Sequence, residues 1–296
     1  MEAKHAFMKG LSGYGIFYRT EDFLVFITIV SVLVRKMNLT ILSFCPMFNH
    51  IHFLIKDISK QRLRSFIQRV AITFVKQYNM YYSREGSLFK KAFGYSIKRS
   101  VKIIMGSCAY VFNNTVAGKL FKTAKEYKWN LLAYLESDHP FSKPLVKKTC
   151  RHKMRIVLEK VDYFNKNNMY LTYNVLESIF DKIKKEEHSQ LVDYILSKYS
   201  FLSKEALLEL YADYDHLIAA INSNAGSEYE LEDEYGDHSC YRTMLGIVRK
   251  LGYKGNKLNF EALPSEEVDD LYNLILSNTA IPSYNINRFL HRAGGT

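Results

Sequence analysis

The chain has 296 residues, of which 48% are hydrophobic and 14% aromatic, so it can bury a core and is not a disordered protein. Residues 1–160 hold 28 Lys and Arg against nine Asp and Glu, a net charge of +19, whereas residues 161–296 have a net charge of −8. The division predicts two units, 1–137 and 138–296, joined by the segment SDHPFSKP at 137–144. A basic first unit is typical of proteins that bind a phosphate backbone, although charge alone favours a nucleic-acid partner only modestly.

Cysteine spacing and hydropathy indicate in which cellular compartment the protein is expected. The four cysteines match neither zinc-binding spacing nor a small disulfide framework, which fits a reducing cytoplasm. The first ten residues lack the apolar core of a signal peptide. The most apolar run, 23–34, is shorter than the roughly 20 residues that span a bilayer, so we expect a buried helix there. We therefore expect a cytoplasmic protein with no membrane partner, associated with the nucleoid when it binds DNA.

The first 121 residues alternate between strand and helix patterns. Thr20 followed by two acidic residues predicts a helix start, with Thr20 as the N-cap. We expect a strand within 4–18, a helix from 20 to about 36, paired strands at 38–45 and 51–57, a helix at 59–84, a basic loop or short strand at 86–100 and a helix at 101–121. This order predicts an α+β fold with a ferredoxin-like (split βαβ) antiparallel sheet.

The second unit is expected to be an all-α accessory region. Helical patterns occur at 175–185, 191–199, 240–252 and 265–278, and an acidic segment lies at 227–237. The stretches YRTMLGIVRKLG and IPSYNINRFLH are a weak signal for a helix-turn-helix. An accessory, regulatory or dimer-contact role explains this region equally well.

The stretch CPMFNHIHFLIKD at 45–57 carries two histidines in an apolar strand pattern. Because alternate residues of a strand share a face, His50 and His52 would stand side by side while Ile51 points the other way. Two imidazoles on one face can hold a metal ion, or they can be two hydrated histidines on a sheet surface. The pair alone does not decide between these readings.

A tyrosine on the helix expected at 101–121 adds a nucleophile to the pair. Tyr110 and Asn114 are four residues apart and share one helical face. A metal ion would polarise a scissile phosphate, the Tyr110 phenolate would attack phosphorus, and the amide oxygen of Asn114 suits a hard cation such as Mg²⁺ or Mn²⁺. The alternative is that Tyr110, one of 22 tyrosines, is a packing residue.

Four segments resemble one known family in their order and spacing. PMFNHIHFLI (46–55) resembles the MPNHVHLL-type motif of the HUH single-tyrosine transposases, the insertion-sequence-200-like and REP-associated group. The segments at 16–27, 78–97 and 109–135 are similar to the family's Phe-x-x-Asp-Asp helix start, its Gly-x-Leu-Phe segment and its segment from the tyrosine to Tyr-x-Trp-Ser-Ser-Tyr. The chain departs from the family at Lys9-Gly10, Phe48-Asn49 and Thr115, which indicates a divergent branch.

The resemblance implies a DNA transposase, a tyrosine transesterase of the HUH endonuclease type. His50 and His52 match the metal ligands, and Asn114 matches the polar residue that completes the metal site. Tyr110 matches the tyrosine that attacks single-stranded DNA, forming a 5′-phosphotyrosine link and releasing a 3′-OH. The family often recognises a DNA hairpin and acts as a monomer or a homodimer.

A basic cluster predicts the path of the DNA. Phosphate contacts are expected from Arg62, Arg64, Arg69, Lys90, Lys91, Lys98, Arg99 and Lys102. Phe93 and Tyr95 lie between these lysines and could stack on unpaired bases. A solvated basic face is the alternative reading of the cluster.

Two other functions stay open at this point. The chain could be a domesticated protein that binds DNA hairpins without cutting them, or a metal phosphoesterase in which water is the nucleophile. Tyr81 and Tyr82 are alternative nucleophiles, but their helix is expected to pack against the sheet, which favours a structural role.

Overall fold

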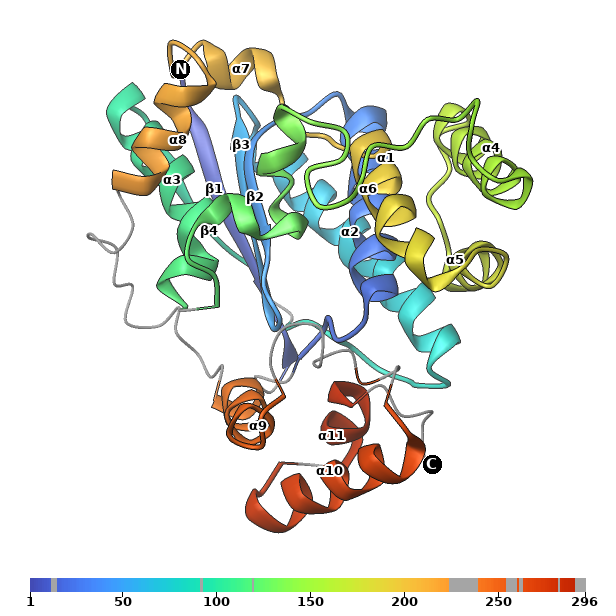
Figure 1. Ribbon diagram of the computed structural model, residues 1–296. Coiled ribbons are helices and arrows are strands. Elements are labelled where there is room, and N and C mark those ends of the chain that lie inside the picture. Colours follow the sequence, from blue (N-terminus) through green and yellow to red (C-terminus); the bar gives the residue numbers. More distant parts are fainter. Residues whose placement is uncertain are drawn as a thin grey trace.

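The computed structural model describes residues 1–11, 15–90, 93–118, 120–223, 239–253, 260, 263–281 and 283–290. It is an α+β structure in which a sheet and three long helices precede a helical region (Figure 1). The first part consists of β1 (Ala3–Lys9), α1 (Thr20–Met37), β2 (Thr40–Pro46), β3 (His50–Lys56), α2 (Lys60–Tyr81), β4 (Gly94–Lys98) and α3 (Val101–Ala117).

The remaining described elements are all helical, as expected. Three short 3-10 turns, η2 (Ala124–Glu126), η3 (Lys128–Asn130) and η4 (Leu132–Leu135), follow α3. They are followed by α4 (His152–Lys166), α5 (Tyr173–Phe180), η5 (Lys185–Glu187), α6 (His188–Lys198), α7 (Lys204–Leu208), α8 (Tyr214–Ser223), α9 (Ser239–Lys250), α10 (Ser265–Asn278) and α11 (Ser283–Phe289). The acidic segment at 227–237 lies outside the described residues.

The four strands form one antiparallel sheet in the order β2-β3-β1-β4. The strand that carries the two histidines, β3, is therefore internal. In the register, His52 lies opposite Phe7 of β1 on one side and Cys45 of β2 on the other. A strand paired on both sides holds its side chains in a defined alternation, which fixes the face on which the histidines lie.

The two faces of the sheet are covered by different helices (Figure 1). Phe53 of β3 packs on Phe66 of α2, with ring centroids 5.5 Å apart, and Phe44 of β2 packs on Phe26 of α1 at 6.4 Å. The opposite face meets α3, where the ring of Tyr110 lies 6.1 Å from that of His52. Alternation along β3 thus separates an apolar core face from a face with polar chemistry.

Helix α1 begins as expected, but its cap differs by one residue from the prediction. Arg19, not Thr20, is the N-cap. The carboxylate of Asp22 accepts the backbone N–H groups of Tyr18 at 2.9 Å and Arg19 at 3.1 Å. A side-chain carboxylate in the first turn can satisfy these unpaired donors, so Thr20 is not needed for capping.

The apolar run at 23–34 is largely buried in this helix, and no helix of the described ranges is long and apolar enough to cross a bilayer.

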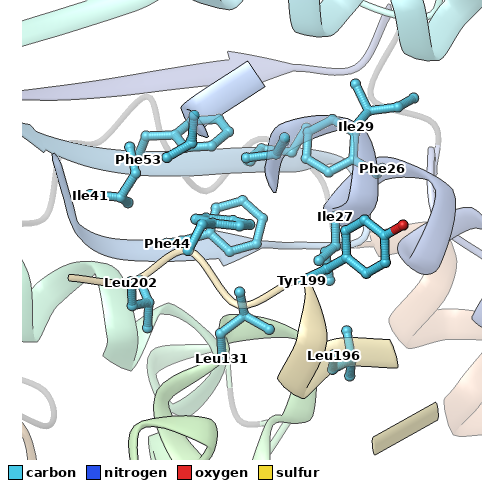
Figure 2. Close-up of a cluster of buried hydrophobic side chains, with 14 of the residues drawn as sticks. Phe26, Ile27, Ile29, Ile41, Phe44, Phe53, Leu131, Leu196, Tyr199 and Leu202 are labelled. Atoms are coloured by element: carbon cyan, nitrogen blue, oxygen red, sulfur yellow. The ribbon is translucent and has the colours of Figure 1, made fainter. Parts of the chain in front are cut away.

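The main hydrophobic core extends well past the first unit. It runs from Ala3 to Ile221 without a break at 137/138. Figure 2 shows Leu196 of α6 and the following Leu202 in the same cluster as Phe44 of the sheet. The predicted boundary is therefore not marked by a gap in packing.

The segment expected to be a linker is anchored to α6. Asp193, which is fully buried, accepts hydrogen bonds from the Tyr134 hydroxyl at 2.7 Å, the Ser142 hydroxyl at 2.8 Å and the Phe141 amide at 3.0 Å. A buried carboxylate is stable only when it is well hydrogen-bonded, so these three donors hold the segment in place.

A second, smaller core is formed by α9, α10 and α11, which gather beyond one end of the sheet (Figure 1).

Candidate active site

The candidate site lies on the face of the sheet that α3 covers. His50 and His52 project from β3 and are 5% and 1% exposed. In the pairing of β1 with β3, Lys9 lies opposite His50 and Phe7 opposite His52. His5 follows on the same face of β1, two residues before Phe7. The described cysteines Cys45, Cys108 and Cys150 are free thiols.

The structure brings the predicted tyrosine to the predicted histidines. The rings of His50 and His52 are perpendicular, with centroids 4.9 Å apart. The Tyr110 ring lies edge-on to His52, at 6.1 Å between centroids. Residues far apart in the sequence, on β3 and α3, thus meet in one site within a single chain.

Asn114 lies one turn after Tyr110 on α3. Its Nδ2 donates to the backbone carbonyl of Tyr110 at 3.0 Å and approaches that of Val111 at 3.4 Å. These bonds use the amide nitrogen and leave Oδ1 as the atom of Asn114 suited to a hard cation.

Sequence reasoning missed one residue of the site, His5. Its Nε2 atom lies 2.9 Å from Nδ1 of His52, and the two rings are nearly parallel, at 25°, with centroids 5.1 Å apart. The His5 ring also meets the ring of Tyr110 edge-on at 5.7 Å. The sequence predicted a strand within 4–18, but it did not predict the register that sets His5 beside His52.

Burial keeps the imidazoles of His5 and His52 neutral at physiological pH. It lowers the pKa of His5 to about 4, assisted by the positive charge of Lys98. It also lowers the pKa of His52 well below its usual value, with further contributions from His50, His5 and Lys9. A neutral imidazole is the form that binds metal, so protons compete weakly for this site near pH 7.

Two imidazoles at the site have ring nitrogens that could accept a divalent cation. Nε2 of His52 is buried and has no hydrogen-bond partner, which is costly for a polar atom unless another group satisfies it. Nδ1 of His50 lies 2.8 Å from Oδ1 of Asn49, an acceptor that places the proton on Nδ1 and the lone pair on Nε2. Within the described ranges no group of three or more His, Cys, Asp or Glu is arranged to hold a metal. A cation held by the two imidazoles would therefore need a ligand of another kind, and the amide oxygen of Asn114 is the one that the sequence predicts.

The predicted DNA-binding residues fall into two groups on different parts of the molecule. Arg62, Arg64 and Arg69 are exposed on α2, on the sheet face opposite Tyr110. Arg99 and Lys102 are exposed at the junction of β4 and α3, and Lys98 lies on the same sheet face as His5. Lys90 is exposed before β4, and Lys91 lies outside the described residues.

Some of these cations already have protein partners. The guanidinium of Arg62 donates to the carbonyl of Met37, and Arg99 lies 3.7 Å from the carboxylate of Glu2. An exposed ion pair such as Arg99–Glu2 contributes little free energy to stability, so a phosphate can displace Glu2 from Arg99.

A cavity of about 350 Å³ brings Arg64 and Lys90 together. Its wall also includes Phe93 and Met8. Met8 points to the face of β1 opposite that of Phe7 and Lys9, so this cavity is separated from the histidines by the sheet. The predicted aromatic and basic residues are thus neighbours, but not at the tyrosine.

The alternative nucleophiles, Tyr81 and Tyr82, donate hydrogen bonds to carboxylates away from the candidate site. Tyr82 donates a 2.8 Å hydrogen bond to Asp22, and burial raises its pKa. Tyr81 donates to Glu177, and burial raises its pKa to about 12. A phenol with a raised pKa is a poor nucleophile, which agrees with the structural role expected for both residues.

The expected helix-turn-helix pieces correspond to α9 and α11 of the smaller core. The first turn of α10, between them, carries Glu266 and Glu267. The helix-turn-helix interpretation of this region stays a prediction. Comparisons of the chain with family models, with curated proteins and with solved structures give no match.

Proposed function

We propose that the chain is a metal-dependent transesterase of the HUH single-tyrosine transposase type, which cuts and rejoins single-stranded DNA through Tyr110. The placement of Tyr110 beside His52, with ring centroids 6.1 Å apart, carries this proposal. A purely structural tyrosine has no need to face two buried imidazoles. The strand order β2-β3-β1-β4, with α1 and α2 on one face, supports the finer description of the sheet as ferredoxin-like.

The chemistry assigns one role to each residue. A Mg²⁺ or Mn²⁺ ion held by His50, His52 and Asn114 would offset the charge of the scissile phosphate. The Tyr110 hydroxyl oxygen attacks phosphorus, the bond from phosphorus to the 3′ oxygen breaks, and the proton lost by the phenol is balanced by the proton gained at the 3′-OH. Rejoining is the reverse reaction, in which a 3′-OH attacks the phosphotyrosine and releases Tyr110.

The charge around the site supports a polyanionic substrate. Lys9 and Lys98 lie on the same sheet face as the histidines, and each contributes to keeping a histidine neutral. We expect these two lysines to provide phosphate contacts at the site that weaken with salt, whereas the exposed cations of α2, on the opposite sheet face, could contact only a more distant part of the DNA. We propose single-stranded DNA, bearing a hairpin, as the partner. The histidines and the tyrosine lie close together within one chain, so a monomer has these groups in place, and a homodimer is equally compatible.

A covalent-adduct assay tests the proposal. Hairpin-bearing single-stranded DNA, labelled at its 3′ end, is incubated with the full chain with and without Mn²⁺ and analysed on a denaturing gel. We expect a labelled protein band that needs Mn²⁺ and that is lost in Tyr110→Phe. Tyr163→Phe is the matched control, because Tyr163 is 60% exposed on α4, away from the site.

The outcomes separate the rival functions. Cleavage without a protein-linked label would indicate hydrolysis by water, the phosphoesterase alternative. Hairpin binding without cleavage, unchanged in Tyr110→Phe and His52→Ala, would indicate a non-cutting binding protein. Either result would overturn the transesterase proposal.

A further inference from the structure

His5 makes a buried polar contact that the proposed chemistry has not yet used. It is 4% exposed, and its Nε2 atom lies 2.9 Å from Nδ1 of His52. The rings are nearly parallel, at 25°, with centroids 5.1 Å apart, so the two imidazoles meet almost end to end, as an in-plane hydrogen bond between ring nitrogens requires. The edge contact with Tyr110 places His5 against both the candidate ligand and the candidate nucleophile.

The direction of this hydrogen bond decides which nitrogen of His52 carries the proton, and therefore whether Nε2 of His52 can bind a cation. A neutral imidazole has one N–H donor and one lone-pair acceptor. If His5 donated, Nδ1 of His52 would be the acceptor and Nε2 would carry the proton, leaving a buried donor without a partner. If His5 accepts, the proton of His52 lies on Nδ1 and the buried Nε2 carries a lone pair. Only the second arrangement avoids an unsatisfied donor and suits a cation.

We propose that His5 is a positioning residue, which accepts the Nδ1–H of His52 and thereby presents Nε2 of His52 to a divalent cation. The proposal rests on the metal site of the proposed function. His50 is oriented in the same way by a different residue, because Oδ1 of Asn49 accepts its Nδ1–H at 2.8 Å. Each ligand is thus oriented by its own acceptor, an arrangement typical of metal-binding histidines.

A positioning role makes a different prediction from a packing role. If His5 only fills space, an apolar residue of similar size serves as well as a polar one. If His5 is needed as an acceptor, glutamine should replace it in part, because its amide oxygen can reach the position of Nε2. Phe7 offers a matched control, since its ring packs against that of His52 at 6.2 Å without a hydrogen bond.

The test is the affinity of the full chain for Mn²⁺ alone, measured by electron paramagnetic resonance of the free ion. We expect His5→Leu to weaken Mn²⁺ binding about 10- to 100-fold, the usual effect of removing an outer-shell partner. His5→Gln and Phe7→Leu should stay within about threefold of the wild type by the same reasoning. Thermal unfolding of each variant confirms that the affinities are measured on folded protein.

Equal Mn²⁺ affinity of His5→Leu and the wild type would overturn the proposal, as would equal losses in His5→Leu, His5→Gln and Phe7→Leu. Failure to detect Mn²⁺ binding by the wild type would overturn it as well. The adduct assay separates this inference from the proposed function. An adduct with normal Mn²⁺ binding by His5→Leu removes only the role of His5. A His5-dependent Mn²⁺ site without any adduct removes only the transesterase activity.

Discussion

The buried carboxylate of Asp22 lies 2.8 Å from the hydroxyl of Tyr173, joining the first turn of α1 to the start of α5 across 151 positions of sequence. The same oxygen accepts the hydroxyl of Tyr82 at 2.8 Å. Three helices therefore meet at one carboxylate, and the helical region is linked to α1 and α2 by polar contacts as well as by the core.

Removing this carboxylate should destabilise the whole fold. We expect Asp22→Ala to lower the free energy of unfolding by about 3 kcal/mol or more, because two buried hydroxyls and two backbone N–H groups lose their acceptor. Tyr173→Phe should cost about 1 kcal/mol, since it removes one donor and leaves Asp22 with others. Urea unfolding followed by circular dichroism measures both, and exposed Tyr163→Phe is the control. Equal stability of Asp22→Ala and the wild type would contradict the assigned role.

Stability should fall as the pH decreases from 6.5 toward 4. The pKa of His5 is lowered to about 4 in the folded chain, so the unfolded chain binds more protons in this interval and acidification favours unfolding. The loss from His5 amounts to about 2 kcal/mol at pH 5 and is absent above its unfolded pKa of about 6.5. Urea midpoints of the wild type and His5→Gln at pH 7.5 and pH 5 measure this contribution. The variant should lose less stability on acidification, and equal losses would show that His5 is not buried as described.

The two basic groups should both contribute to DNA affinity. Changing Lys98, Arg99 and Lys102 together to Gln should reduce the slope of log affinity against log salt by about two for single-stranded DNA, if each cation contacts one phosphate. Changing Arg62, Arg64 and Arg69 together to Gln tests whether the cations on the opposite sheet face also contact DNA phosphates. Fluorescence anisotropy at several salt concentrations gives the slopes, with exposed Lys153→Gln on α4 as the control. An unchanged slope in either triple variant would remove that group from the DNA path.

Truncation should distinguish the two hydrophobic cores. A chain ending at residue 223 keeps the whole main core, which runs to Ile221, and we expect it to fold and to unfold cooperatively. A chain ending at residue 137 loses the contacts of Leu196 and Leu202 with the sheet cluster (Figure 2), and we expect it to aggregate. Size-exclusion chromatography and thermal unfolding compare the two. A monomeric, cooperatively folded 1–137 fragment would support the domain boundary that the sequence predicts at 137/138.

The sequence predicted local structure better than it predicted which elements pack together. The strand alternation around His50 and the turn spacing from Tyr110 to Asn114 are local properties, and the elements that carry them lie where expected. His5 was missed because its importance depends on the register between β1 and β3, which a single strand does not encode. The continuous core was missed for a similar reason. An amphipathic helix such as α6 reveals its apolar face but not the surface that the face covers.

The internal position of β3 has a mechanical consequence for the two halves of the candidate site. A slip of one residue in β3 would break its ladders with both β1 and β2 and turn both histidines into the core of α1 and α2. Amide hydrogens of β3 should therefore exchange with deuterium only through global opening of the protein. Tyr110, by contrast, is carried by α3, which packs across the strands without sharing their ladders. The sheet therefore fixes the positions of the imidazoles, and we expect any movement that admits or releases a DNA strand to occur in the helix that bears the tyrosine rather than in β3.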